Sequence, residues 1–212
     1  MEPRAVLIFD TNILVDIWLA RDGNESVLLL QLAEEGIVDL VLPEYVLIEF
    51  RGFALRWLRD ERAKLEQRVR TLAREWGRSD DLDEGADLIA AGCRKVDEGL
   101  EGLRNTIDQV AKRVRAVARV KPHTPEIHFR GDLRFLSGRP PDRPIGGIKD
   151  CRIFEAILEI AAEQERGERL KYVVTKDQDF DHEELRLQLD AQGFSIRKDP
   201  GRLFGELRPR PD

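Results

Sequence analysis

Carboxylate side chains that follow short apolar segments suggest metal chemistry in this chain. Asp10 comes directly after the apolar segment Ala5–Phe9, and both Asp177 and Asp179 follow the apolar segment Tyr172–Thr175. Two like charges about 4 Å apart repel each other by about 4 kcal/mol at an effective dielectric constant of about 20. A hard divalent cation offsets this repulsion, because Asp and Glu oxygens are ligands that suit Mg²⁺ and Mn²⁺. The pattern therefore predicts a site for one or two Mg²⁺ or Mn²⁺ ions, provided that these acids meet in space.

Two further acids stand in the first turns of predicted helices. Glu49 lies one or two turns into a helix that begins near Glu44, after the apolar segment Val38–Leu42. Asp150 opens an amphipathic helix shortly after two consecutive glycines. In an open α/β sheet, ligands bind beyond the carboxyl ends of the strands, so we expect the acids to converge at that edge. The predicted set is Asp10, Glu49, Asp150 and Asp177, with Asp179 as the rival of Asp177.

Each of these acids also has a simpler explanation when it is considered alone. Asp is a favoured helix N-cap, so Asp10 and Asp150 could each cap a helix. Asp177 and Asp179 could be turn formers after a strand, and Glu49 could be a solvated helix residue. The complete set is more specific than any member, because each acid stands at the corresponding end of its element. The set therefore favours the metal site.

The elements that must position these acids alternate between strands and helices. Continuous apolar runs predict buried strands, and apolar residues at three- and four-residue spacing predict helices. The predicted strands are Ala5–Phe9, Val38–Leu42, Tyr172–Thr175 and Phe194–Ile196, and the predicted helices are Ser26–Glu35, a helix from Glu44, a helix from Asp150, and His182–Gln192. This alternation predicts an α/β fold with a mainly parallel sheet and helices on both faces. Residues Lys121–Lys149 read as a loop with one short strand near Ile127–Phe129.

The middle of the chain has a different pattern, because apolar residues recur there at alternating spacings of three and four. This regularity predicts two long helices that pack as an antiparallel pair, with a break at the sequence GRSDD (77–81). We therefore interpret residues 1–212 as a single domain with residues 59–121 as an inserted helical hairpin. Four glycines of the second helix, at positions 85, 92, 99 and 102, either permit close approach of another element or mark a break.

The bulk composition excludes several classes of protein. The formal net charge is −6 and the sequence pI about 5.3, so the chain is not a bulk polycation, and any nucleic-acid contact must come from local basic patches. The two cysteines are far apart and are expected to be free thiols. No stretch is long and apolar enough for a signal sequence or a membrane span, so we expect a cytoplasmic protein.

Basic residues that could contact a nucleic acid occur near the acidic positions. The predicted contacts are Arg51, Arg130, Arg134, Arg139, Arg143 and Lys149. Contacts of such side chains with phosphates would make binding fall steeply with salt. A solvated surface explains any one of these charges equally well.

Four short motifs together resemble the PIN-domain nucleases. They are FDTNILVD (9–16), VLPEYVLIEF (41–50), GGIKDCRIFEAIL (146–158) and YVVTKDQDF (172–180). The resemblance implies a three-layer α/β/α sandwich and hydrolysis of single-stranded RNA at a Mg²⁺ or Mn²⁺ site. It assigns the ligand positions to Asp10, Glu49, Asp150 and Asp177 (or Asp179), with Asn12 and Thr175 as supporting residues. The long middle insertion makes the chain similar to an enlarged relative of the VapC-type toxin ribonucleases.

These observations lead to the hypothesis of a metal-dependent endoribonuclease. Water would attack the phosphodiester in line, leaving a 5′-phosphate and a 3′-hydroxyl. The expected partners are single-stranded RNA, with DNA not excluded, an antitoxin protein if the chain is the toxin of a toxin–antitoxin pair, and a second copy joined through the helical arm.

Two alternatives come from other classes of protein. A phosphatase of the haloacid dehalogenase type also begins with an Asp after its first strand, but it needs a second Asp two residues later, where this chain has Asn12. The second alternative is a catalytically weak or inactive PIN-like module that binds protein or nucleic acid through its helical arm. Metal-dependent RNA cleavage distinguishes this module from the nuclease.

Overall fold

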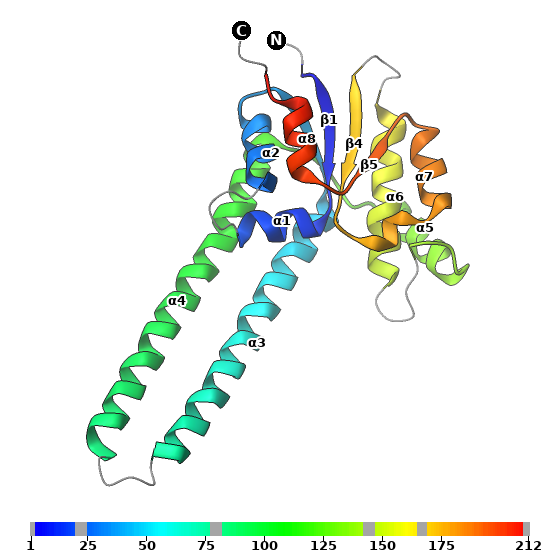
Figure 1. The fold of residues 1–212 in the computed structure, drawn as a ribbon. Coiled ribbons are helices and arrows are strands. Elements are labelled where there is room, and N and C mark those ends of the chain that lie inside the picture. Colours follow the sequence, from blue (N-terminus) through cyan, green and yellow to red (C-terminus); the bar gives the residue numbers. More distant parts are fainter. Residues whose placement is uncertain (1–2, 20–24, 77–81, 142–146, 165–168, 210–212) are drawn as a thin grey trace. The chain divides into compact units, whose positions relative to one another are not determined.

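A five-stranded parallel sheet forms the centre of the α/β part of the molecule (Figure 1). The computed structural model describes residues 3–19, 25–76, 82–141, 147–164 and 169–209, with only the backbone of residues 73–76 and 82–89. The strand order is β3-β2-β1-β4-β5, and each neighbouring pair is parallel. The strands are β1 (Ala5–Phe9), β2 (Val38–Pro43), β3 (Arg119–Lys121), β4 (Leu170–Val174) and β5 (Ser195–Arg197). The predicted parallel α/β sheet is confirmed.

Helices cover both faces of this sheet, as predicted (Figure 1). Helices α2 and α8 pack against each other over one face, while α5, α6 and α7 lie over the other. The bounds are α1 (Thr11–Trp18), α2 (Glu25–Glu34), α5 (Pro125–Leu136), α6 (Gly147–Glu163), the 3₁₀ helix η1 (Gln178–Asp181), α7 (Glu183–Asp190) and α8 (Pro200–Leu207). Two helical layers bury the sheet from both sides, which explains why its strands read as continuous apolar runs.

Strand β1 lies at the centre of the core. All five of its residues, Ala5–Phe9, are 0% exposed, because the strand is paired on both edges and covered on both faces. Its register sets Phe9 opposite Val174 of β4. The two central strands therefore end at the same level, and the polar residues that follow them meet at the carboxyl edge of the sheet.

Helix α5 corrects the prediction of a loop and short strand in this region. Residues Pro125–Leu136 are helical, and Thr124 caps the helix by accepting a hydrogen bond from Ile127 N. Pro125 at the first helical position also favours this start. The helix packs on α6 through Gly131, where an added Cβ would lie 2.5 Å from Arg152 Cγ. A helix that buries a glycine on its packing face gives a weak apolar pattern, which explains the error.

Four other elements, α1, β3, η1 and α8, have no counterpart among the predicted strands and helices. Strand β3 is three residues long and becomes a strand only by pairing with β2. Helix α8 begins with the cap Asp199 and with Pro200 at its first position. Neither cysteine forms a disulfide bond, as predicted. No helix in the described parts of the chain is long and apolar enough to cross a bilayer.

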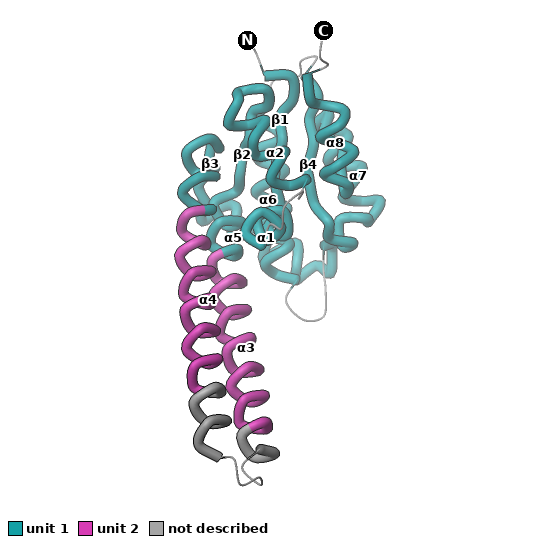
Figure 2. The backbone as a smooth tube through the Cα atoms, turned by 60° about the vertical axis from the view of Figure 1, so that its left-hand side comes forward, with its two compact units in different colours: residues 1–50, 110–212 teal, residues 51–109 magenta. Residues whose placement is uncertain are grey.

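The chain divides into two compact units (Figure 2). The first unit, the α/β unit, contains residues Met1–Phe50 and Val110–Asp212, and the second contains residues Arg51–Gln109. The second unit is a hairpin formed by parts of two long helices, α3 (Glu44–Trp76) and α4 (Leu82–Val117). The predicted pair of long helices is confirmed, and α4 continues through its glycines without a break. The break predicted at residues 77–81 lies outside the described residues.

Candidate functional site

Asp10 stands at the carboxyl end of β1 and caps α1. Its Oδ1 accepts a hydrogen bond of 2.7 Å from the backbone N of Thr11. Its own backbone N donates to the carbonyl of Val174 at the end of β4, at 3.0 Å. The capping role considered from the sequence is therefore present. Capping alone does not require burial, however, and Asp10 is only 6% exposed.

The surroundings of Asp10 disfavour its charged form. Burial is the main cause, and it raises the pKa of Asp10 from 3.8 to about 6. Hydrogen bonds from Thr175 and Thr11 lower this pKa, while the negative charges of Glu49 and Asp177 raise it further. Two of the other predicted acids, Glu49 and Asp177, are thus each close enough to Asp10 to repel its charge. This repulsion is the electrostatic situation that a cation would relieve.

Asn12 and Thr175 hold the second carboxylate oxygen of Asp10. The Thr175 hydroxyl donates to Asp10 Oδ2 at 2.7 Å, and Asn12 Nδ2 donates to the same oxygen at 2.8 Å. Asn12 Nδ2 also donates to the Thr175 hydroxyl at 3.1 Å, and that hydroxyl accepts from the backbone N of Asp177 at 3.0 Å. Asn12 Oδ1 accepts from the backbone N of Lys176 at 3.0 Å. These bonds join the residues after β1 to the residues after β4 and orient Asp10.

Glu49 approaches this network from α3, within the α/β unit. Its Oε2 accepts a hydrogen bond of 2.7 Å from the Thr11 hydroxyl. Its Oε1 lies 3.9 Å from Nζ of Lys149, on the first turn of α6. The Glu49 side chain is 17% exposed, so it is not the solvated helix residue that the sequence alone allowed.

Asp177 and Asp179 occupy the turn after β4. Asp177 caps η1, because its Oδ1 accepts a hydrogen bond of 3.0 Å from the backbone N of Asp179. The turn-forming role considered from the sequence is therefore present for Asp177. Its charge also acts on Asp10, so the same residue both starts η1 and borders the acidic region.

Asp150 lies within the first turn of α6, which begins at Gly147. It is therefore not the N-cap of that helix, which was its simpler explanation. The preceding residue, Lys149, reaches Glu49, so the turn that carries Asp150 lies beside the part of α3 that carries Glu49. Asp150 is half-buried.

The donor atoms of this region fit a hard divalent cation in type, because they are carboxylate oxygens. Their present partners are protein groups: Thr11 and Lys149 for Glu49, and the Asn12–Thr175 pair for Asp10. Within the part of the chain that the structure describes, no group of three or more His, Cys, Asp or Glu side chains is arranged to hold a metal ion. Lys149 supplies one positive charge beside Glu49, in the region where the prediction sets a divalent ion.

The predicted nucleic-acid contacts are mostly ion-paired within the protein. Arg51 belongs to the hairpin unit and pairs there with Asp108. In the α/β unit, Arg139 Nε donates to Glu184 Oε1 at 2.8 Å, and Lys149 is the neighbour of Glu49 already described. Arg143 lies outside the described residues.

Arg130, Arg134 and Arg139 line one cavity of about 280 Å³ in the α/β unit. Arg134 is enclosed: its side chain is 3% exposed, and it donates to Glu155 Oε1 at 2.7 Å and to the carbonyl of Pro140 at 2.9 Å. Arg130 Nε lies 3.3 Å from Glu155 Oε2 and is 42% exposed. Three of the six predicted basic residues therefore lie around one cavity, and each has a carboxylate partner.

One residue of the site was missed by the sequence prediction. Thr11 links two of the acids, because its backbone N donates to Asp10 and its hydroxyl donates to Glu49. Thr11 lies between Asp10 and Asn12 in the first motif, and this position could have indicated that it belongs to the site. The interaction with Glu49 joins residues 38 positions apart, so only the fold reveals it.

Comparisons with known proteins were made after this geometry. Residues 7–180 match the protein family described as PIN domain. A search of curated proteins found no match. Among solved structures, the chain is similar to a chain in the crystal structure of VapBC2 from Rickettsia felis bound to a DNA fragment from their promoter. That similarity has 12% sequence identity and a TM-score of 0.37, and it covers 91% of this chain and 99% of that chain.

Proposed function

The chain belongs to the PIN domain family, whose members are commonly nucleases, and we propose that it is a metal-dependent endoribonuclease that cleaves single-stranded RNA. The observation that carries this proposal is the buried carboxylate of Asp10. It is oriented by Asn12 and Thr175 and lies within electrostatic reach of Glu49 and Asp177. Burial of a carboxylate that two nearby carboxylates repel is unfavourable for a purely structural site. A divalent cation explains it.

The proposed ligands are Asp10, Glu49, Asp150 and Asp177, with Asp179 as the rival of Asp177. Mg²⁺ or Mn²⁺, when bound, would lower the pKa of water and stabilise charge on the transferring phosphorus. Asn12 and Thr175 hold Asp10 in a fixed orientation, and Thr11 does the same for Glu49. Such supporting contacts strengthen metal sites because they remove the freedom of the ligands.

The RNA strand would reach this edge through cationic side chains of the α/β unit. Lys149 supports this proposal most directly, because it is 43% exposed and lies beside Glu49. Arg130 and Arg139 are also accessible, at 42% and 50% exposure. Their carboxylate partners would have to be exchanged for phosphates, so we expect binding that weakens steeply with salt.

The test is cleavage of a mixed pool of single-stranded RNA by the full chain in Mn²⁺ or Mg²⁺, with single-stranded DNA as a parallel substrate. We expect cleavage that stops in EDTA, with products that end in a 5′-phosphate. Asp10→Asn should lower the rate at least about a hundredfold, since even changes in residues around metal ligands cost about 10- to 100-fold. Asn also caps helices, so this variant should keep its fold.

Asp181→Asn is the matched control for Asp177→Asn. Both residues belong to the turn after β4, but Asp181 is an exposed residue that pairs with Arg186 at 2.9 Å and with Lys198. Loss of cleavage in Asp177→Asn alone supports the proposed ligand set. Equal activity of the two variants and the wild-type chain would remove Asp177 from it.

A non-catalytic PIN-like module is the second candidate, and one observation favours it. No three acids are arranged as a metal-ligand group in the described ranges, and Lys149 already neutralises part of the charge on Glu49. Calorimetry with Mn²⁺ separates the two candidates. Binding that is lost in Asp10→Asn supports the nuclease. A well-folded chain that neither binds Mn²⁺ nor cleaves RNA supports the module.

The toxin hypothesis is a finer proposal about the same activity. It rests on the resemblance of the motifs to toxin ribonucleases, and it includes an antitoxin protein as a partner. If it holds, expression of the chain in a bacterial host arrests growth and expression of Asp10→Asn does not. Normal growth at equal expression of an enzymatically active chain would argue against the toxin role while leaving the nuclease intact.

A further inference from the structure

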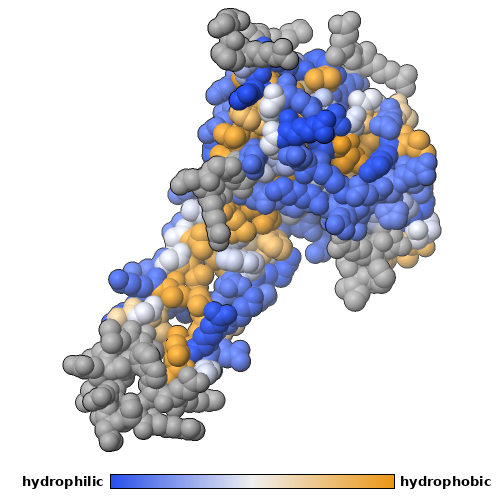
Figure 3. All heavy atoms as spheres, viewed as in Figure 1, coloured by the Kyte–Doolittle hydropathy of each residue, from blue (hydrophilic) through white to orange (hydrophobic). Residues whose placement is uncertain are grey.

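The hairpin unit has an apolar stripe that its own two helices do not bury. The stripe consists of Leu65, Val69 and Leu72 of α3 and Cys93, Val96, Leu100 and Leu103 of α4, and we call it the seam. No side chain in residues 59–72 or 90–106, all of which the structure describes, is buried. Leu72 is 43% exposed. Figure 3 shows apolar side chains along the hairpin between hydrophilic ones. An apolar helix stripe is stable when another element covers it.

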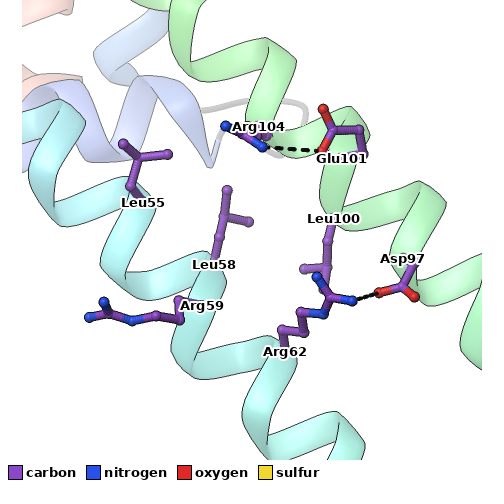
Figure 4. Close-up of a pocket in the computed structure, with 8 residues that line it drawn as sticks. All are labelled: Leu55, Leu58, Arg59, Arg62, Asp97, Leu100, Glu101 and Arg104. Carbon is purple, nitrogen blue, oxygen red and sulfur yellow. Dashed lines mark ion pairs between the residues drawn. The ribbon is translucent and has the colours of Figure 1, made fainter.

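Two cavities along this hairpin show how incompletely the helices fill the space between them. The larger has a volume of about 500 Å³ and is lined by Leu55, Leu58, Leu100 and charged residues that include Arg62 and Asp97 (Figure 4). The second, of about 290 Å³, is lined by five seam residues and by Gly92. Both cavities open to the surface, so the groove between the two helices has room for side chains of another element.

The arrangement of residues around α4 shows which side of the seam is open. Asp97 and Asp108 face α3, because Arg62 lies 3.3 Å from Asp97 and Arg51 pairs with Asp108. At about 100° per residue, both acids lie about 60–80° to one side of Leu100, whereas Gly92 and Gly99 lie about 80–100° to the other side.

These two glycines are seven residues apart and have free space around them. A Cβ added at Gly92 or Gly99 would meet nothing within 4 Å. Gly92 also lines the smaller cavity together with Leu65 and Val69 of α3. A third helix can therefore approach α4 closely along the edge of the seam that carries Gly92 and Gly99. Helices of bundles use this flanking position, together with the central stripe, to pack against a neighbour.

We propose that the seam is the interface with a second copy of this chain, and that the two hairpins form a four-helix bundle. In this bundle, α3 of each copy packs on the glycine side of α4 of the other. A two-fold axis makes the contact self-complementary. The proposal concerns the hairpin alone and does not depend on the proposed nuclease activity.

The charges of the hairpin favour this pairing over others. Among the described side chains, residues 51–72 of α3 contain seven Lys or Arg and three Asp or Glu, for a net charge of +4. Residues 90–109 of α4 contain three Lys or Arg and four Asp or Glu, for a net charge of −1. Packing α3 on the partner's α4 brings opposite charges together. Packing α3 on the partner's α3 would bring two positively charged helices together, which is unfavourable.

The size of the seam face is also sufficient for a stable dimer. Residues 51–72 of α3 form a helix about 33 Å long, and two helices side by side give a face about 20 Å wide. Each copy would then bury about 650 Å², and both together about 1,300 Å². Stable specific interfaces bury about 1,200–2,000 Å² in total.

The first test is the mass of the full chain in solution, measured by light scattering over a range of concentrations. We expect a species of twice the 24.4 kDa chain mass that dissociates on dilution.

Cys93 provides a second measurement, because it lies in the seam whereas Cys151 is buried in the α/β unit. Its reaction with a thiol reagent should be slow in the dimer and fast after dilution. The variant Cys93→Ser should lose this reaction, which assigns the measured signal to Cys93.

A pair of glycine variants separates loss of dimerisation from loss of folding. Gly99→Leu fills the open side of α4, whereas Gly102→Leu lies about 160° from Leu100, away from the seam. A Cβ at Gly102 also meets nothing within 4 Å. Both substitutions raise helix propensity, so circular dichroism should show no loss of helix. We expect Gly99→Leu to weaken the dimer about tenfold or more, since overpacking an interface is unfavourable, and Gly102→Leu to leave it unchanged.

Three results would overturn the proposal. The first is a chain that remains monomeric at high micromolar concentration with a fast-reacting Cys93. The second is a dimer whose stability is unchanged by Gly99→Leu. The third is a monomer whose Cys93 becomes protected only when a different polypeptide is added, which would assign the seam to that other partner.

Discussion

The two units of this protein differ in how completely they bury their apolar residues. In the α/β unit, a sheet covered by two helical layers leaves Ala5–Phe9 completely buried. In the hairpin, the seam stays partly exposed although its apolar pattern is as regular as that of any segment of the chain. The difference is one of geometry, because the described part of the hairpin unit consists of two helices side by side and supplies no third layer of its own.

This difference determines what each unit can do. A dry interior changes the chemistry of a polar group inside it, as the raised pKa of Asp10 shows. An uncovered seam has no such effect, because water reaches it. It instead favours association, since burying the seam against another surface releases that water. The α/β unit is therefore suited to chemistry and the hairpin to assembly.

The largest expected contrast between the units is in the packing of single side chains. Phe154 is 0% exposed and contacts the ring of Phe180 at a centroid distance of 6.0 Å. Phe154→Ala should lower the free energy of unfolding by about 3–5 kcal/mol. Leu72→Ala, in the seam, should lower it by less than about 1 kcal/mol in the monomer. Urea titration monitored by fluorescence checks both values, and equal effects would contradict the contrast.

Ion pairs should show the same contrast. Arg134 and Glu155 are 3% and 12% exposed and 2.7 Å apart, whereas Arg62 and Asp97 are 59% and 54% exposed and 3.3 Å apart. Arg134→Ala should lower the free energy of unfolding by about 2–3 kcal/mol, because it removes the hydrogen bonds of an enclosed guanidinium to Glu155 and to the Pro140 carbonyl. Arg62→Ala should cost less than about 1 kcal/mol, and salt should reduce that cost. A larger effect of Arg62→Ala would reverse the comparison.

The network around Asp10 can be tested by removing one hydroxyl. Thr175→Val keeps the shape of a fully buried side chain but removes the donor to Asp10 and the acceptor for Asp177 N. We expect a loss of about 2–3 kcal/mol in the free energy of unfolding, since a buried group loses its partner. The Mn²⁺ concentration needed for half-maximal cleavage should also rise. Thr71→Val, on the exposed surface of the hairpin, is the control and should change neither quantity.

The pH dependence of stability should reveal the buried acid. The folded-state pKa of Asp10 is raised to about 6 from 3.8. Its contribution to stability is therefore complete below about pH 3.8 and is lost as the pH rises through about 6. In EDTA, the stability of Asp10→Asn relative to the wild-type chain should rise by about 2 kcal/mol between about pH 4 and about pH 7.5. A difference that stays constant with pH would show that Asp10 is not held in a dry site.

The sequence predicted most of the fold because its strands and long helices carry strong local patterns. The β1 run is apolar throughout, and the hairpin has alternating spacings of three and four, so both were identified. Helix α5 was not identified from the sequence, because its packing face uses Gly131 and the ion-paired Arg134 in place of apolar residues. Strand β3 was not, because three partly polar residues form a strand only beside β2.

The residues of the candidate site could be predicted from the sequence, but several contacts between them could not. Asp10, Asn12 and Thr175 were named from the motifs, and the structure joins them by hydrogen bonds. The bond from Thr11 to Glu49 and the approach of Lys149 to Glu49 were not foreseen. These contacts depend on where α1, α3 and α6 lie relative to one another, which no local pattern specifies.

The sequence by itself determined which segments become the central strands and the long helices, and which acids follow them, because periodicity and capping act over a few neighbouring residues. Only the tertiary structure decided that β3 is a strand, how deeply Asp10 is buried, which hydroxyl each carboxylate contacts, and that the two helices of the hairpin do not bury the seam. Burial depends on how many layers surround a residue, and the number of layers is a property of the assembled fold rather than of any segment.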